Sequence, residues 1–144
     1  MTPPRPILEW FWALHRAVRR ASGGRLGTSD ATEDRIGTLF LHTVGRKSGQ
    51  PRANALFYLL DGANLVVVAS NAGAATDPAW ALNLRDRPDA EVEITGRRRP
   101  VRARSATTDE ETRLWPRLVT ANPDYADYSA KVDRPIPVVI LEPR

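Results

Sequence analysis

The sequence contains no cysteine, and this absence excludes several kinds of chemistry. Disulfides, zinc sites with thiolate ligands and a cysteine nucleophile are impossible in this chain. Histidine is almost as scarce, because His15 and His42 are the two present and they lie far apart in the sequence. Since nitrogen-ligated zinc sites gather several histidines, we expect no metal site.

Long apolar runs are missing too. No stretch approaches the roughly 20 apolar residues that a helix needs to cross a bilayer. Near the N-terminus, Glu9 interrupts the apolar residues and the arginines follow them, which is the reverse of a secretory signal. We therefore expect a cytoplasmic protein.

Acidic residues are absent from residues 36–60, although Arg46, Lys47 and Arg52 lie close together in that segment. Glycine and proline around these cations predict a turn. Surface cations are usually interspersed with acids, and arginine offers a planar fork that matches phosphate or carboxylate. Two interpretations remain open at this point, a binding site for a polyanion and a solvated hairpin tip.

The bulk composition is that of one basic domain. The chain has 144 residues, 42% of them hydrophobic, and a formal net charge of +4. This size fits a single core, and the charge favours an anionic partner without naming it.

Apolar residues recur at helical spacing between Ile7 and Val18 and predict an amphipathic helix over residues 7–20. The helix either packs on the domain or lies peripherally at the inner membrane face, with Trp10 and Trp12 at the interface. We expect residues 1–35 to form this helix and a loop, and residues 36–144 to form the main domain.

Short apolar and β-branched runs separated by turn signals predict about six strands, at residues 36–43, 53–60, 65–70, 90–94, 101–105 and 138–141. Helices are expected at residues 79–85, with Asp77 as the N-cap, and at residues 108–121, with Thr108 opening a capping box. Residues 71–76 are small and predict a flexible connection. Short links between strands favour an α+β fold, a small antiparallel barrel with peripheral helices.

Two other segments have the character of a ligand site. Small residues end the strand before Asn71, so a flat ring could lie against the backbone there and accept hydrogen bonds from free N–H groups, and a helix N-terminus follows. An ordinary strand-to-helix connection has the same pattern. Tyr125 and Tyr128 share one face of a helix, where they either wall an apolar slot or pack on the core.

Together these motifs resemble the deazaflavin-dependent nitroreductase and quinone reductase family, whose members use coenzyme F-420. The resemblance covers about residues 36–143, and its motifs lie at residues 43–52, 69–71, 78–84, 115–118, 125–128 and 133–139.

The resemblance implies an FMN-binding-like split β-barrel with the deazaflavin at its rim. The phosphodiester and glutamates of the coenzyme tail suit the cationic turn. Ser70 and Tyr128 would be catalytic, and Tyr125 and Tyr128 would face the acceptor. The implied cofactor-binding residues are Arg46, Lys47, Ser48, Arg52, Ala53, Asn54, Ala55, Leu56, Phe57, Val68, Ala69, Ser70, Asn71, Ala79, Trp80, Ala81, Leu82 and Asn83.

Three positions depart from the family pattern. Relatives often have lysine at Asn71, tyrosine at Asn122 and an aromatic residue at Ala81. The resemblance therefore implies one tail contact fewer at Asn71 and a differently shaped acceptor pocket.

The resemblance implies an oxidoreductase that passes a hydride from reduced coenzyme F-420 to a quinone, with nitroaromatics as further acceptors and a homodimer as one possible assembly. Two alternatives are an FMN-dependent enzyme on the same barrel and a carrier of an apolar or lipid ligand. The arginines between Arg97 and Arg104 also raise nucleic-acid binding, which the absence of a recognisable motif disfavours.

Overall fold

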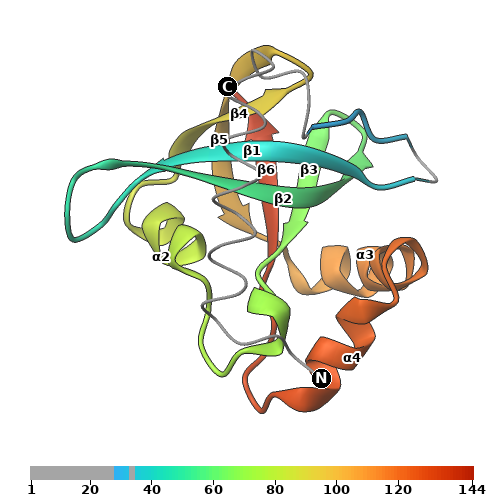
Figure 1. The fold of residues 1–144 in the computed structure, drawn as a ribbon. Coiled ribbons are helices and arrows are strands. Elements are labelled where there is room, and N and C mark those ends of the chain that lie inside the picture. Colours follow the sequence, from blue (N-terminus) through green and yellow to red (C-terminus); the bar gives the residue numbers. More distant parts are fainter. Residues whose placement is uncertain (1–27, 33–34) are drawn as a thin grey trace.

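The computed structural model describes residues 28–32 and 35–144. Its strands form one closed antiparallel barrel in the order β1-β2-β3-β6-β5-β4 (Figure 1). The strands are β1 Gly37–Val44, β2 Pro51–Asp61, β3 Asn64–Val68, β4 Asp89–Ile94, β5 Arg97–Ser105 and β6 Val138–Pro143. The helical elements are η1 Asn71–Gly73, α2 Ala79–Asp86, α3 Thr108–Ala121 and α4 Asp124–Lys131. The predicted α+β barrel with peripheral helices is confirmed.

The predicted N-terminal helix lies outside the described residues, and so does its proposed contact with a membrane. The division of the chain at residue 35 therefore stays a prediction. Of the described N-terminal residues, Ser29 bridges to Thr38 of β1, and the N–H of Ala31 donates to the Tyr58 hydroxyl at 2.9 Å. In the described part of the chain, no helix is long and apolar enough to cross a membrane.

Alternation along the strands builds the barrel interior. Leu39 and Leu41 of β1 are fully buried in the interior cluster, together with Leu65 and Val67 of β3. Trp80 of α2 joins this cluster, so α2 closes one end of the barrel. Because side chains two apart share a face of a strand, the register fixes which residues face inward.

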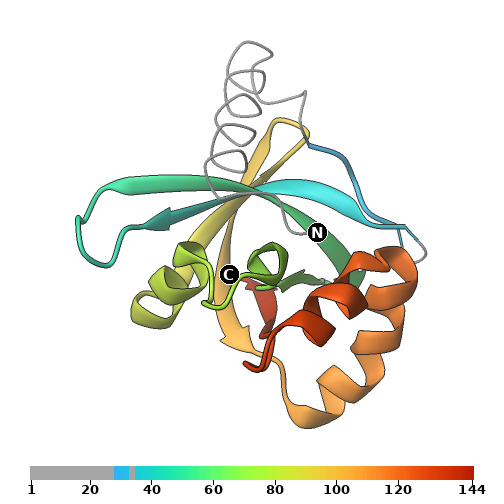
Figure 2. The same cartoon turned by 60° about the horizontal axis from the view of Figure 1, so that its bottom comes forward.

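A second cluster lies between the barrel wall and the helices α3 and α4. Leu59 of β2 and Val66 of β3 pack there against Leu114, Leu118 and Tyr125. Figure 2 shows α3 and α4 on one side of the barrel and α2 on the other. The two sides of the molecule are thus built from different helices.

Both helices begin where the sequence predicted, at Ala79 and Thr108, but the predicted capping residue of each is corrected by one position. The capping box of α3 is formed by Thr107 and not by Thr108, because Thr107 and Glu110 each accept a hydrogen bond from the other's backbone N–H. Residue 78, a proline, occupies the N-cap position of α2, and no side chain caps this helix. The Asp77 carboxylate binds two guanidinium groups instead, which are stronger partners than backbone N–H groups.

Strand β5 begins at Arg97, four residues before the predicted start at Val101. The arginines at its start pair with β4 in the sheet. Arg98 binds Glu91 and Arg102 binds Asp89 across the two strands. Opposite charges on neighbouring strands stabilise such pairs. Cross-strand pairing therefore extends a strand that its own residues do not predict.

Candidate cofactor site

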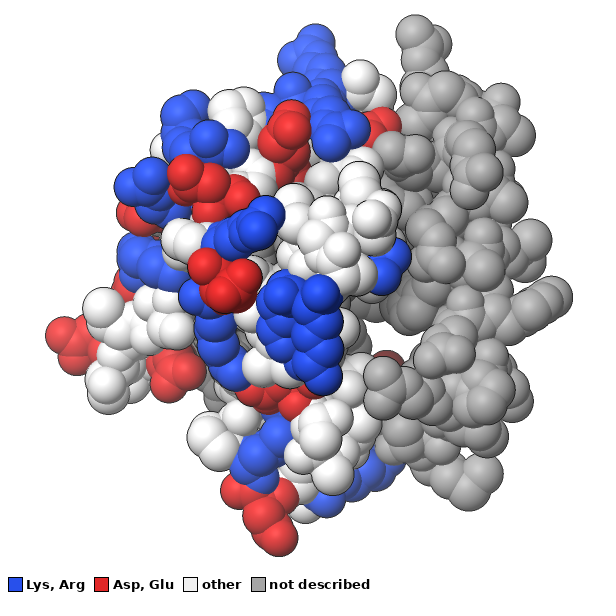
Figure 3. Space-filling view, turned by 90° about the vertical axis from the view of Figure 1, so that its left-hand side faces the viewer, with Lys and Arg blue, Asp and Glu red and all other residues white. Residues whose placement is uncertain are grey.

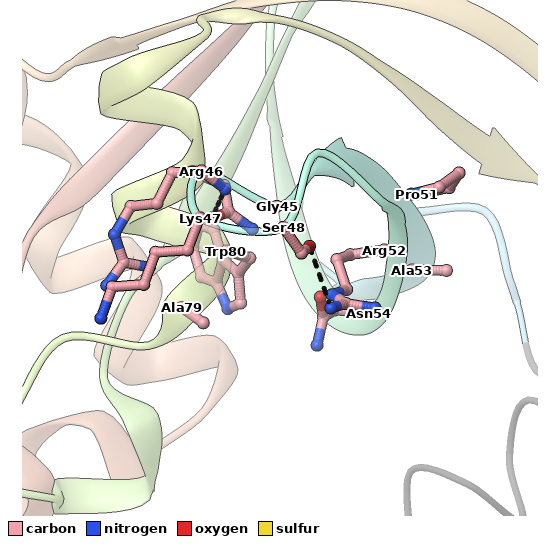
Figure 4. Close-up of a pocket in the computed structure, with 11 residues that line it drawn as sticks. Gly45, Arg46, Lys47, Ser48, Pro51, Arg52, Ala53, Asn54, Ala79 and Trp80 are labelled. Carbon is pink, nitrogen blue, oxygen red and sulfur yellow. Dashed lines mark hydrogen bonds between the residues drawn. The ribbon is translucent and has the colours of Figure 1, made fainter.

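A cleft of about 600 Å³ lies between the β1–β2 turn and the start of α2 (Figure 4). This volume is typical of small-molecule sites. Apart from Gly45 and Pro51, every lining residue belongs to the predicted cofactor-binding residues. The lining residues are Gly45, Arg46, Lys47, Ser48, Pro51, Arg52, Ala53, Asn54, Ala79, Trp80 and Asn83.

Two glycines shape the β1–β2 turn. The N–H of Gly45 donates to the carbonyl of Gln50 at 2.9 Å, and the N–H of Gly49 donates to the carbonyl of Gly45 at 2.8 Å. Gly49 has a φ of 69°, which favours glycine. A Cβ on Gly45 would lie 2.6 Å from the Ser48 hydroxyl oxygen, so this position has no room for a side chain unless Ser48 moves.

Ser48 positions the side chain of Arg52. Its hydroxyl oxygen accepts hydrogen bonds from the N–H of Gln50 and from the Arg52 guanidinium, both at 3.2 Å. Figure 4 shows Arg46 and Lys47 extending side by side near the start of α2, with Arg52 and Asn54 across the turn from them. Cations from the turn and from the start of β2 therefore border the same cleft.

Asn83 fixes this turn from α2. Its side chain is 4% exposed, and its amide oxygen accepts a hydrogen bond from the N–H of Arg46 at 3.0 Å. The amide nitrogen donates to the Thr43 hydroxyl at 3.3 Å. The sequence placed Asn83 in the site as a ligand contact, and the structure also makes it a support of the turn.

The cleft is strongly electropositive. Within residues 28–32 and 35–144, Arg46, Lys47 and Arg52 make no ion pair, and the Arg52 guanidinium binds only the neutral Ser48 hydroxyl. Figure 3 views the molecule from the side where this turn lies, and Lys and Arg cover much of that face with acids between them. The uncapped N-terminus of α2 borders the cleft and adds a partial positive charge.

The loop after β3 forms a hydrogen-bonded turn, and its predicted flexibility stays a prediction. Ser70 is in the right-handed helical region, and Asn71, Ala72 and Gly73 follow with φ values of 49°, 52° and 79°. The N–H of Gly73 donates to the Ser70 carbonyl, and the N–H of Ala74 donates to the Asn71 carbonyl, both at 3.0 Å. Such consecutive conformations form a nest of converging N–H groups that binds anionic atoms.

Several donors of this loop are free. Among the described residues, the N–H groups of Ser70, Asn71 and Ala72 have no acceptor, and the Ser70 hydroxyl has no partner. Ser70 is 8% exposed, so its hydroxyl is a buried polar group that a ligand could satisfy. These donors match the free N–H groups that the sequence led us to expect beyond the strand.

Other predicted cofactor residues do not line the cleft. Phe57 is 50% exposed on β2, whereas Ala55, Val68, Ala69 and Ala81 are buried. The role of each in binding stays a prediction, as it does for the loop. The full group outside the cleft is Ala55, Leu56, Phe57, Val68, Ala69, Ser70, Asn71, Ala81 and Leu82.

The two tyrosines lie on α4, away from the cleft. Tyr125 is 5% exposed within the second cluster, and burial raises its pKa to about 12. Tyr128 packs against the same cluster but is half-buried, and burial also raises its pKa. Because α4 packs against η1, Tyr128 belongs to the side of the molecule that carries Ser70. Its contact with an acceptor stays a prediction.

Sequence reasoning missed the supporting role of Arg134. This side chain is 14% exposed and reaches the loop after β3 from the segment before β6. Its position inside a matching motif, residues 133–139, was the one signal that could have drawn attention to it.

Comparison with known proteins gives a consistent result. A family model described as F420H(2)-dependent quinone reductase matches residues 11–143. The chain belongs to this family. Two relatives from Mycobacterium tuberculosis (strain H37Rv) carry the same description in their names. One is 45% identical over 76% of this chain and 92% of the relative, and the other is 36% identical over 91% and 89%.

Solved structures agree with the fold and the family. A structure named as an F420-H2 dependent reductase is 32% identical and has a TM-score of 0.66, covering 78% of this chain and 98% of that one. A second, described as a domain-swapped dimer, is 29% identical with a TM-score of 0.68, covering 94% and 98%. The predicted family and split-barrel fold of this chain are thereby confirmed.

Proposed function

We propose that this protein is an oxidoreductase that passes a hydride from reduced coenzyme F-420 to a quinone. The observation that supports it most directly is the cleft beside the β1–β2 turn, where Arg46, Lys47 and Arg52 have no acidic partner in the described part of the chain. Family membership supports the same activity. When bound in its reduced form, the coenzyme supplies the hydride.

The residues present fit this coenzyme. The tail carries a phosphodiester and glutamates, and three cations together with the start of α2 offer matching charge. The unpaired donors around Ser70 suit a ring with carbonyl oxygens. FMN ends in one phosphate and would use fewer of these cations.

The acceptor side needs a proton as well as a hydride, because a quinone that gains a hydride becomes a phenolate. We assign the Ser70 hydroxyl to hydrogen bonding with the ring or the acceptor, and the Tyr128 hydroxyl to delivery of the proton. Burial raises the pKa of Tyr128, so this phenol is protonated at neutral pH.

A titration of the purified protein with coenzyme F-420 and with FMN tests the proposal. We expect tighter binding of coenzyme F-420, and oxidation of its reduced form only when a quinone is added. Arg97→Ala is the matched control for variants that remove a cation of the cleft, and it should bind coenzyme F-420 as the wild type does. Arg97 is an exposed arginine on β5 that does not line the cleft. Equal or tighter binding of FMN would contradict the choice of cofactor.

We also propose that the protein forms a homodimer. The support is the similarity to the structure described as a domain-swapped dimer, which extends over 94% of this chain. Light scattering on the eluting protein should give twice the mass of one chain, and a mass of one chain would contradict the proposal.

A further inference from the structure

The loop after β3 is held by one buried side chain from a distant part of the sequence. The Arg134 guanidinium donates to the carbonyl oxygens of Ala69 at 3.3 Å, Ser70 at 2.9 Å and Ala74 at 3.1 Å. It also binds the Asp77 carboxylate at 2.6 Å. All three of its nitrogens are therefore engaged with residues 69–77.

These contacts determine where the N–H groups of the loop point. The described backbone has no cis peptide bond, so each carbonyl points opposite to the N–H of the next residue. Because the carbonyls of Ala69 and Ser70 face Arg134, the N–H groups of Ser70 and Asn71 face away from it. These are two of the N–H groups that have no acceptor among the described residues.

The conformation that exposes these donors is a strained one. Asn71 and Ala72 both have positive φ values, in the left-handed region that residues with a side chain rarely adopt, and alanine adopts it less readily than asparagine. Such conformations persist where surrounding contacts determine them. The guanidinium bonds to the loop carbonyls are contacts of this kind.

Asp77 links this arrangement to α2. One carboxylate oxygen binds Arg134 and the other binds Arg85 of α2, each at 2.6 Å. The loop is thus fastened at its start by carbonyl contacts and at its end by a carboxylate that is shared with the helix bordering the cleft.

We propose that Arg134 is a positioning residue for hydride transfer, which holds the Ser70 hydroxyl and the N–H groups of Ser70 and Asn71 toward the ring or the acceptor. This inference rests on the proposed function, but the contacts that carry it belong to the unliganded chain. Arg134 acts through the loop, because four of its five N–H donors bind the loop carbonyls and the Asp77 carboxylate.

The first test needs no cofactor. In the Arg134→Gln variant, the hydrogen-bonded amides of Gly73 and Ala74 should exchange with solvent at least about tenfold faster, because the turn opens. The amide of Gly49, which is hydrogen-bonded in the distant β1–β2 turn, should exchange at the wild-type rate.

The second test separates turnover from binding. We expect Arg134→Gln to lower kcat with a quinone about tenfold or more and to weaken the affinity for coenzyme F-420 less than kcat, because the cationic turn that binds the tail is untouched and only the donors near the ring are displaced. Arg134→Lys keeps the charge beside Asp77 but loses the fork that reaches three carbonyls, so it should restore stability more than turnover. Arg144→Gln is the matched control, since Arg144 donates to the carbonyls of Val101 and Ala90 away from the loop.

Wild-type exchange and wild-type kcat in a folded Arg134→Gln variant would overturn the proposal. If Arg134→Gln does not fold, Asp77→Asn should show the same changes to a smaller extent, and unchanged exchange and kcat in that variant would equally overturn it. If the wild-type protein fails to bind coenzyme F-420, the proposed function fails, whereas the exchange test still decides whether Arg134 holds the loop.

Discussion

The amide oxygen of Asn83 and the backbone N–H of Arg46 are joined by a hydrogen bond of 3.0 Å, across 37 positions of sequence. This bond connects α2 to the β1–β2 turn, so the two walls of the cleft are fixed relative to each other. Because Asn83 is 4% exposed, no solvent can replace its oxygen without rearrangement.

Replacing Asn83 by alanine should weaken both the fold and cofactor binding. The variant loses a buried bond to the Thr43 hydroxyl and a part-buried bond from the Arg46 N–H, each contributing about 0.5–1.5 kcal/mol, and the turn that carries Arg46 would lose its support. Urea unfolding and titration with coenzyme F-420 measure the two effects. Asn83→Asp keeps an oxygen for the Arg46 N–H but adds a negative charge to the cationic cleft, so it should weaken binding of the polyanionic coenzyme at least as much as alanine does. An alanine variant with wild-type affinity would show that the turn needs no support from α2.

Removing two cations of the cleft should weaken coenzyme binding without unfolding the protein. Hydrogen bonds to charged groups contribute about 1.5–3 kcal/mol each, so Arg46→Ala combined with Arg52→Ala should lower affinity about 100-fold or more. Binding to the wild type should also weaken as salt rises, since exposed charges are screened. Unchanged affinity and an unchanged salt response in the double variant would show that the turn is a solvated hairpin tip.

Substituting Gly45 by alanine should disturb the site through Ser48. The added Cβ would lie 2.6 Å from the Ser48 hydroxyl oxygen, which must rotate away and release Arg52. Gly62→Ala is the control. Its φ of 61° would strain an alanine there, but the added Cβ would have nothing within 4 Å. We expect Gly45→Ala to lower coenzyme affinity and Gly62→Ala to lower only the free energy of unfolding, and the reverse pattern would rule out this role for Ser48.

Stability should fall at low pH through the pairing of Glu110 with Arg104. The Arg104 guanidinium lowers the pKa of Glu110 from 4.5 to about 2. A carboxyl with a depressed pKa stabilises the fold fully above its unfolded value, and this contribution is lost as pH falls from about 4.5 to about 2. Thermal unfolding across that range should show a smaller loss of Tm for Arg104→Gln than for the wild type, and Arg98→Gln, which removes the exposed pair with Glu91, serves as the comparison.

The two tyrosines should respond differently to loss of the hydroxyl group. Tyr128→Phe should lower turnover with a quinone about 100-fold if its phenol delivers the proton, with little change in coenzyme affinity. Tyr125→Phe keeps the ring that packs against Leu114 and Leu118 and should affect stability more than turnover. Steady-state oxidation of reduced coenzyme F-420 measures both, and equal turnover losses would assign Tyr125 a direct role as well.

The barrel could be predicted largely from local patterns, because alternation and turn residues are properties of neighbours in the sequence. The start of β5 could not, since Arg97, Arg98 and Arg99 are poor evidence for a strand until β4 supplies their partners. The choice between Thr107 and Thr108 as the cap of α3 depended in the same way on a contact, because Glu110, three residues after Thr107, is held by Arg104.

The cationic side of the site was equally visible in the sequence, since the absence of acids around Arg46, Lys47 and Arg52 is a local feature. The residues that support the turn and the loop could not be predicted from the sequence. Asn83 and Arg134 act on segments 37 and 64 positions away in the sequence, and their residue types suggest a ligand contact or a surface charge. Only the folded chain shows that each side chain also hydrogen-bonds to the backbone of a distant loop.

The place of β6 between β3 and β5 has a consequence for how the chain folds. During synthesis β3 and β5 are made long before β6, so each carries an unpaired edge until Val138–Pro143 arrives. Long-range pairings of this kind slow folding, and exposed edges invite association with other chains. A nascent chain stalled before Val138 should therefore bind chaperones and aggregate readily. Once β6 is synthesised and pairs with β3 and β5, chaperone binding and new aggregation should stop.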